Sequence, residues 1–270
     1  MKVCYVSSGY FKSNLSGETR LIDCIIDKAV SDRVDMVILL GNLSKNYIDT
    51  LHIIDTLGAK LKEVGISLRF IVGNTDFYYH DPVVNKVERF YEIRGMYNNN
   101  KYCLFTHPII TQSFWIIGAE TWYDYSLYRG KPVQLRDICK KRKWFISNKD
   151  NYYITDKDDY ALGLKNTFDY IYTSDCVGNL NTALSRYEKK MLSPIHKVIV
   201  GYFYPTKILL KDNYIEKYFG TFKGSERFYD ILEKHRVTDY ISGISARKEV
   251  IRYNGIQFIS PEGIYEVDYE

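Results

Sequence analysis

Apolar residues in the first third of the chain follow two spacings, one typical of buried strands and one typical of helices. Residues 34–40 are apolar apart from Asp35, a pattern typical of a parallel strand covered on both faces. Before this strand, apolar residues recur at helical spacing from the candidate N-cap Ser16 to Ala29. The pattern predicts strand, helix, strand, helix and strand at residues 2–6, 16–29, 34–40, 49–64 and 67–72. Right-handed crossovers place the carboxyl ends of such strands at one edge of a sheet.

The rest of the chain is predicted to contain a second set of strands and a less regular central stretch. Helices are predicted at residues 82–91, 180–191 and 225–236, and strands at residues 102–105, 114–118, 168–172, 196–201, 239–242, 248–252, 256–260 and 264–268. Tyr253-Asn254-Gly255 indicates a tight hairpin turn. The charged stretch 127–165 is interpreted as an insertion or cap within a single domain that spans residues 1–270.

Composition favours a folded protein of the cytoplasm without a membrane segment. Hydrophobic residues make up 46% and charged residues 26%, which is ordinary for a globular chain. The five cysteines are scattered without CxxC spacing, so a disulfide framework or a zinc knuckle is not expected. No apolar run approaches the length of a membrane span.

Charge gives little support for nucleic-acid binding. A net charge of +4 is weak for a nucleic-acid protein unless it is concentrated in a patch. The tight basic run Lys140-Lys141-Arg142-Lys143 has two interpretations, a solvated helix end or a phosphate-binding patch. The hypothesis of a nucleic-acid partner therefore rests only on the mild positive charge and on this run.

Short polar or glycine-containing loops follow several predicted strands. They are Ser8-Gly9-Tyr10, Gly41-Asn42, Gly73-Asn74-Thr75-Asp76, Gly201-Tyr202 and Gly243-Ile244-Ser245-Ala246. Strand ends of this kind are where α/β proteins gather catalytic groups. The loops therefore predict an active-site rim.

The order of these loops resembles the calcineurin-like metallophosphoesterase superfamily. That family carries Asp-x-His, Gly-Asp, Gly-Asn-His-Asp/Glu, a later His and a final Gly-His-x-His after successive strands. The resemblance extends over nearly the whole chain, and Trp122-Tyr123-Asp124-Tyr125 is similar to a segment of bacterial and phage members. It implies an α/β fold in which two mixed β-sheets pack as a sandwich flanked by helices. It also implies two divalent metals, such as Mn, Fe or Zn, which generate a hydroxide nucleophile.

This chain departs from the family at the residues that hold those metals. Seven motif positions carry other residues: Ser8, Tyr10, Asn42, Thr75, Tyr202, Ile244 and Ala246. In the same order the family has an Asp, a His, the bridging Asp, the catalytic His, a metal-binding His and the two closing histidines. Asn74 and Asp76 keep the family identity. Two neutral amides offset little of the repulsion between two divalent ions, so no catalytic residue, metal or other cofactor is expected.

Three functions follow as hypotheses. The first is a catalytically inactive metallophosphoesterase-like protein that acts as a binding or regulatory module for a protein partner, with a phage or other mobile-element origin. The second is a phosphodiesterase or nuclease with an atypical metal site, rebuilt from residues such as Asp76, His80, His107, Asp124 or Asp175. The third is a nucleic-acid binder.

The five histidines have structural explanations of their own. His52 lies in a predicted helix, His235 at a helix carboxyl end and His196 at the start of a strand. His107 is interpreted as a turn residue, whereas His80 follows the third loop closely enough to approach the site. Nucleophilic catalysis by Ser8 or by a cysteine is not favoured, because no base can be named for either.

Overall fold

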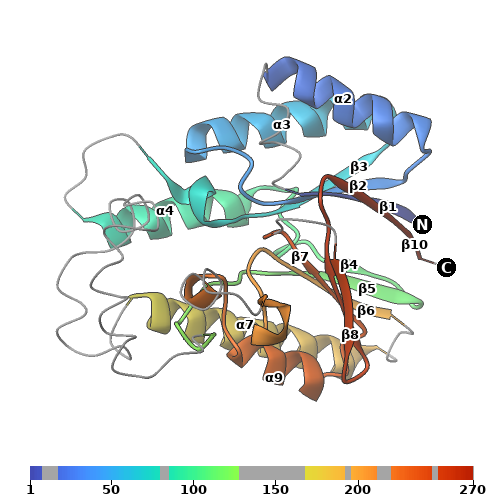
Figure 1. Ribbon diagram of the computed structural model, residues 1–270. Coiled ribbons are helices and arrows are strands. Elements are labelled where there is room, and N and C mark those ends of the chain that lie inside the picture. Colours follow the sequence, from blue (N-terminus) through green and yellow to red (C-terminus); the bar gives the residue numbers. More distant parts are fainter. Residues whose placement is uncertain are drawn as a thin grey trace.

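The computed structural model contains two β-sheets that lie between helices (Figure 1). It describes residues 1–7, 18–79, 85–127, 168–191, 196–211, 220–244 and 249–269. Helices α2 (Glu18–Ser31) and α3 (Tyr47–Glu63) lie on one side of the sheets, and α7 (Phe168–Lys190) and α9 (Arg227–Lys234) lie on the other (Figure 1). The predicted insertion falls almost entirely outside the described residues.

The first sheet has four strands, in the order β10-β1-β2-β3. Their bounds are Ile264–Asp268, Lys2–Val6, Met36–Leu40 and Ser67–Ile71. Strands β1, β2 and β3 are parallel, and β10 runs antiparallel to β1. Every residue of β2 is buried, which explains the continuous apolar run in its sequence.

The second sheet has six strands, in the order β4-β5-β6-β7-β9-β8. In that order their bounds are Ile109–Ile110, Phe114–Ala119, His196–Gly201, Asp239–Ser242, Ile256–Ser260 and Glu249–Tyr253. Strands β5, β6, β7 and β9 are parallel, and the outer strands β4 and β8 are antiparallel to their neighbours. The parallel strands place the loops after β5, β6 and β7 at one edge.

Aromatic side chains join the two sheets. The hydroxyl of Tyr5, on β1, lies 2.8 Å from that of Tyr269, just after β10. The Tyr269 ring stacks on Phe114 of β5, with 5.2 Å between ring centroids. Both tyrosines are buried, so each contributes an apolar ring and a paired hydroxyl to the interior.

The sequence predicted most of these elements, with local errors. The hairpin between β8 and β9 is confirmed, since Asn254 and Gly255 have φ of 47° and 79°, as a type I′ turn requires. Residues 168–172 were predicted as a strand and instead begin α7. The buried residues Phe168, Tyr172 and Cys176 recur every four positions, and this period continues along the helix.

Two further predictions need correction. Residues 102–105 do not form a strand; Cys103 makes only an isolated bridge to Phe70 of β3. Helix α4 spans Lys86–Asn99, later than the predicted 82–91, because the Asn85 side chain caps it by accepting from the Glu88 amide. The last turns of α4 carry polar residues, so the spacing of apolar residues did not show where this helix ends.

Candidate functional site

The strand-end loops of the two sheets meet at one place. Asn42 follows β2, Asn74 follows β3, Tyr202 follows β6 and Ile244 follows β7. The Asn42 side-chain amide donates to Asn74 Oδ1 at 3.2 Å and to the Tyr202 hydroxyl, and the Ile244 amide donates to the Tyr202 carbonyl at 2.7 Å. These residues and Thr75 and Asp76 therefore form one cluster, the strand-end cluster. Ser8, Tyr10, His80 and Ala246 lie outside the described residues.

The Tyr202 ring packs among three glycines of the strand-end loops. A Cβ atom added to Gly41, Gly73 or Gly243 would lie 3.1, 2.8 or 2.8 Å from Cδ2 of this ring. Tyr202 is only 3% exposed, and Phe203 packs edge-on against it with 4.9 Å between ring centroids. The space between the loops is thus occupied by an aromatic ring. A Cβ atom at these glycines would lie closer still to other atoms, at 2.5 Å from Gly73 N for Gly41, 2.2 Å from Asn42 Oδ1 for Gly73 and 1.9 Å from the Leu40 carbonyl oxygen for Gly243.

Asn42 connects three of the loops through its side chain. Its backbone is left-handed, with φ of 52°, a conformation that asparagine tolerates better than most residues. Its Oδ1 accepts from the Thr75 amide at 3.0 Å, and the Thr75 hydroxyl donates to the Ser44 carbonyl at 2.7 Å. The Asn42 amide thus has protein partners on both its oxygen and its nitrogen.

Asp76 is fully buried and is surrounded by donors. Its carboxylate accepts hydrogen bonds from backbone amides and from a helix α3 hydroxyl: Asn42 N at 2.6 Å, Gly73 N at 2.8 Å, Leu43 N at 2.9 Å, Ser44 N at 3.4 Å and Thr50 Oγ1 at 2.9 Å. Burial raises the pKa of Asp76, and the hydrogen bonds act in the opposite direction. Two carboxylate oxygens offer about four lone-pair directions, so these donors occupy the hydrogen-bond acceptor sites of the Asp76 carboxylate.

The described residues do not fit a two-metal centre. Divalent cations are held by carboxylates and imidazoles with free lone pairs. The oxygens of Asn42, Asn74 and Asp76 already accept protein hydrogen bonds. Over the ranges that the structure describes, no group of three or more His, Cys, Asp or Glu side chains is arranged to hold a metal ion.

The other residues considered for a rebuilt site have contacts elsewhere. His107 is exposed, with Nδ1 3.0 Å from the hydroxyl of Thr106. Asp175 is exposed on α7. Asp124 belongs to a separate polar network at the loop after β5. Among the described residues, the side-chain polar partners of His107 are Thr106 and Arg69, and those of Asp124 are Ser126 and Arg227, which lie outside the strand-end cluster.

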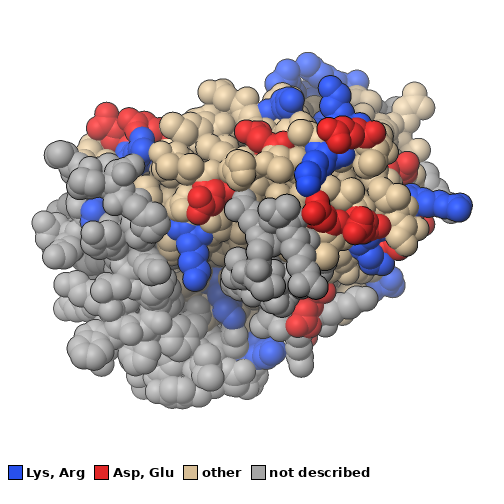
Figure 2. All heavy atoms as spheres, turned by 90° about the horizontal axis from the view of Figure 1, so that it is seen from above, with Lys and Arg blue, Asp and Glu red and all other residues tan. Residues whose placement is uncertain are grey.

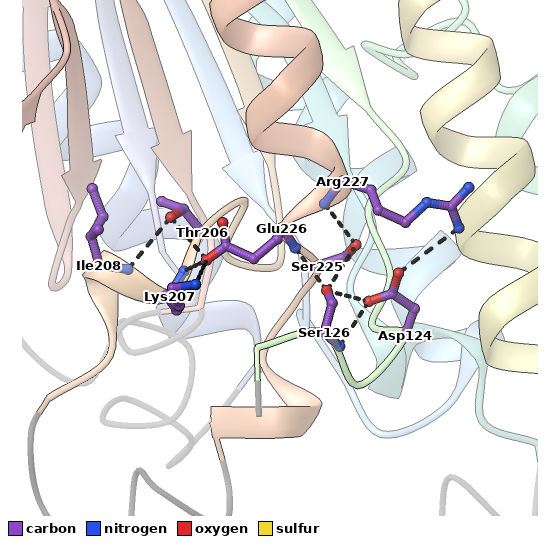
Figure 3. A network of polar contacts seen from close by, with 8 residues as sticks. All are labelled: Asp124, Ser126, Thr206, Lys207, Ile208, Ser225, Glu226 and Arg227. Atoms are coloured by element: carbon purple, nitrogen blue, oxygen red, sulfur yellow. Dashed lines mark hydrogen bonds and ion pairs between the residues drawn. The ribbon is translucent and has the colours of Figure 1, made fainter. Parts of the chain in front are cut away.

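That network ties the loops after β5 and β6 to the start of α9 (Figure 3). Asp124 Oδ1 accepts from the amide and the hydroxyl of Ser126 at 3.1 and 2.6 Å, and its Oδ2 lies 3.8 Å from the Arg227 guanidinium. Glu226 accepts from the Lys207 amide at 2.6 Å, and its own amide donates to the Ser126 hydroxyl at 2.9 Å (Figure 3). The acidic groups of this network thus serve to fix the loops.

Two structural roles were not predicted from the sequence. Asp169 of α7 is buried and accepts from Trp122 Nε1 at 2.9 Å and from the Tyr125 hydroxyl, which anchors the aromatic loop after β5. The hydroxyl of Thr50, on α3, donates a hydrogen bond to the Asp76 carboxylate. A polar residue on an otherwise apolar helix face was the only sequence signal for each.

The visible surface carries charges of both signs. Lys, Arg, Asp and Glu are interspersed over the coloured part of the view in Figure 2, rather than gathered by sign. Lys140–Lys143 fall outside the described residues, so the basic run stays a prediction. Within the described ranges, no helix combines the length and apolar character needed to cross a bilayer.

The chain was compared with known sequences and structures. No protein-family model matches it. No curated sequence matches it either. A phosphopantetheinyl hydrolase from Mycobacterium tuberculosis superposes with a TM-score of 0.64 at 12% identity, covering 96% of this chain and 87% of that one.

Two further structures are similar over almost the whole chain. A dimetal phosphatase from Danio rerio has a TM-score of 0.56 at 14% identity, covering 97% of this chain and 87% of the other. GAP50, described as the anchor in the inner membrane complex of Plasmodium, has a TM-score of 0.50 at 13% identity, covering 97% and 71%. The chain therefore has the calcineurin-like metallophosphoesterase fold.

Proposed function

We propose that this protein has lost two-metal phosphoester hydrolysis and acts as a binding or regulatory module for a protein partner. The observation that carries the proposal is the Tyr202 ring, which fills the space between Gly41, Gly73 and Gly243. The resemblance assigns a metal-binding imidazole to this position. A buried phenol whose hydroxyl is paired with the Asn42 amide supplies neither a carboxylate nor an imidazole to a metal.

The neighbouring groups support the same proposal. Asn42 stands where the family has the aspartate that bridges the two metals, and a neutral amide cannot balance their charge. Asp76 is the acid that this site retains, and its oxygens are used by Gly73, Leu43 and other donors. We infer that Asp76 was kept for its structural role in joining the loops.

The comparisons add indirect support for a binding role. GAP50 is described as an anchor, so a protein of this fold has been given an anchoring role. In this chain the loops are held together by side-chain hydrogen bonds, and such a scaffold can present a fixed surface to a partner. The proposed partner is a protein, because on the face seen in Figure 2 the Lys and Arg side chains of the described residues are interspersed with Asp and Glu, an arrangement that does not favour nucleic acid.

Metal analysis tests the loss of hydrolysis. The chain is purified without chelator, and its Mn, Fe and Zn content is measured by mass spectrometry alongside hydrolysis of bis(p-nitrophenyl) phosphate. We expect substoichiometric metal and no turnover above the buffer rate. Two tightly bound ions per chain would contradict the proposal. The double variant Asn42→Asp with Tyr202→His, which returns a carboxylate and an imidazole, is the matched comparison, and we expect its metal content to rise above that of the wild type.

The alternative, an enzyme with an atypical site, makes a different prediction. It requires hydrolysis that manganese stimulates and that the substitution His80→Ala abolishes. His80 is the better choice for this test, since substituting Asp76 would also disturb the loops through Asn42 and Gly73. Absence of turnover with several metals would leave this alternative without support.

A further inference from the structure

Strand β8 forms an outer edge of the six-stranded sheet. Among the described residues the strand order ends at β8, with β9 as its neighbour. Val250 and Tyr253 of β8 are 48% and 44% exposed, so two large apolar side chains lie at this edge. An edge strand of this kind is a template for pairing with another chain.

The other sheet edges of the described structure are less suited to such pairing. The outer side of β3 is occupied, because the Phe70 amide donates to the Tyr102 carbonyl at 3.0 Å and the Phe70 carbonyl accepts from the Leu104 amide at 2.9 Å. Strand β4 has only two residues. Strand β10 carries Glu266 at its centre, so two copies paired antiparallel about this residue would oppose like charges.

The backbone of β8 presents hydrogen-bonding groups to its outer side at alternate residues. Tyr253 and Ile256 flank the two-residue turn, so they form a hydrogen-bonded pair. Hydrogen-bonded and non-hydrogen-bonded pairs alternate along an antiparallel ladder. The N–H and C=O groups of Arg252 and Val250 therefore point away from β9.

The contacts of Gln257 agree with this direction for Arg252, its partner in the ladder. The Gln257 amide donates to the Thr238 carbonyl at 2.8 Å, so its N–H faces β7 rather than β8. The Arg252 side chain is also held, because its Nε donates to Gln257 Oε1 at 3.0 Å. The outer side of β8 thus offers backbone donors and acceptors beside an ordered cation.

We propose that β8 pairs with β8 of a second copy of this chain, antiparallel and about a two-fold axis at Ile251. In this register Val250 of each copy lies opposite Arg252 of the other, and each such pair exchanges both N–H···O bonds. Glu249 lies opposite Tyr253, and Ile251 lies opposite its own copy. The pairing joins the six-stranded sheets of two copies into one continuous sheet.

Charge and overlap distinguish this register from its alternatives. Outward-facing backbone groups must meet outward-facing groups, so the axis can lie only at Val250, Ile251 or Arg252. An axis at Arg252 would oppose two guanidinium groups, which is unfavourable. An axis at Val250 or Arg252 would also pair only part of β8, whereas the axis at Ile251 pairs all of Glu249–Tyr253 and opposes no like charges.

Sedimentation velocity of the full chain tests the pairing. Strands this short form a small contact, so we expect a weak dimer with a Kd on the order of 1–100 µM. The weight-average sedimentation coefficient should rise from the monomer value toward the dimer value as the concentration increases through about this range. A coefficient that stays at the monomer value throughout would overturn the proposal.

Two substitutions at Val250 locate the contact. Val250→Glu places a carboxylate opposite Arg252 of the other copy, and Val250→Lys places a second cation there. Both variants lose the same half-exposed apolar side chain, so each is the matched control of the other, and thermal melts followed by circular dichroism check that both fold.

The sign of the introduced charge decides the outcome. The altered pair occurs twice in a two-fold contact, so at low ionic strength we expect the dimer Kd of Val250→Lys to exceed that of Val250→Glu by about fivefold or more. Equal Kd values would place any dimer contact elsewhere on the chain and refute the pairing of β8. Tighter association of Val250→Lys would refute the proposed register.

Discussion

Replacing Asp76 by asparagine is the sharpest test of how the strand-end cluster is held together. The substitution conserves size and removes the charge. The carboxylate now accepts from the amides of Asn42 and Gly73 on one oxygen, and from two further amides and the Thr50 hydroxyl on the other. An asparagine has one carbonyl oxygen, so its NH₂ group must face one of these two sets of donors.

The magnitude follows from the donors that lose their acceptor. With the asparagine oxygen turned toward Asn42 and Gly73, the amides of Leu43 and Ser44 face the new NH₂ group. A buried unpaired donor costs about 1–3 kcal/mol, so two cost roughly 2–6 kcal/mol. Removing a buried charge recovers part of its desolvation cost. We expect a loss of about 3 kcal/mol, equivalent to roughly 6–12 °C in melting temperature.

Urea unfolding at pH 7, followed by circular dichroism and tryptophan fluorescence, measures this loss. The matched control is Asp23→Asn, because the Asp23 side chain is 51% exposed and pairs with Lys60 at the surface. Such surface pairs contribute about 0–1 kcal/mol, so the control should stay close to the wild type. Finding Asp76→Asn within about 1 kcal/mol of the wild type would refute the structural role assigned to this carboxylate.

Further predictions concern the packing around the cluster and the reactivity of the cysteines. Tyr202→Ala should cost about 3–5 kcal/mol in urea unfolding by leaving a cavity, and Tyr202→Phe only about 1 kcal/mol from one hydrogen bond; equal losses would contradict the packing role of the ring. Gly73→Ala should destabilise the fold, because its Cβ would overlap the Asn42 side chain. Gly95→Ala, which has open space around it in α4, should stabilise the fold by about 0.5–1 kcal/mol. A higher melting temperature for Gly73→Ala than for Gly95→Ala would refute the described crowding. Burial raises the pKa of the Cys4 thiol to about 12. Iodoacetamide at pH 8 should therefore label the exposed Cys24 and leave Cys4 unmodified until the chain unfolds, as measured by mass spectrometry. Labelling of Cys4 in the folded chain would contradict its burial.

Local patterns predicted the elements that depend on short stretches of sequence. The hairpin at Asn254-Gly255 and the buried strand β2 were found because turn chemistry and continuous apolar runs are properties of a few adjacent residues. The start of α7 was missed because Phe168 to Tyr172 also has the aromatic content of a strand. Only the continuation of its buried face to Leu184 distinguishes the helix, and an intervening run of small and polar residues hid that continuation.

The sequence also predicted that the strand-end loops lie together, since glycines at successive strand ends place Asn42, Asn74, Tyr202 and Ile244 at a common edge. It showed at which motif positions this chain differs from the family that it resembles. The pairing of the Asn42 amide with Tyr202, across 160 positions of chain, could not be predicted, because contacts between two sheets depend on how the sheets pack. The sequence likewise gave no sign that Thr50 donates to Asp76.

By itself, the sequence determined that the motif positions of the family it resembles carry residues such as Asn42 and Tyr202, because residue identity alone decides whether a side chain can supply a charged oxygen or an imidazole. The tertiary structure decided what these residues contact. Tyr202 fills the space between three glycines, and Asp76 gives its lone pairs to the backbone. The place of Tyr202 depends on how the two sheets pack, and that of Asp76 on the distance between the loops after β2 and β3, and neither distance is set by a local pattern.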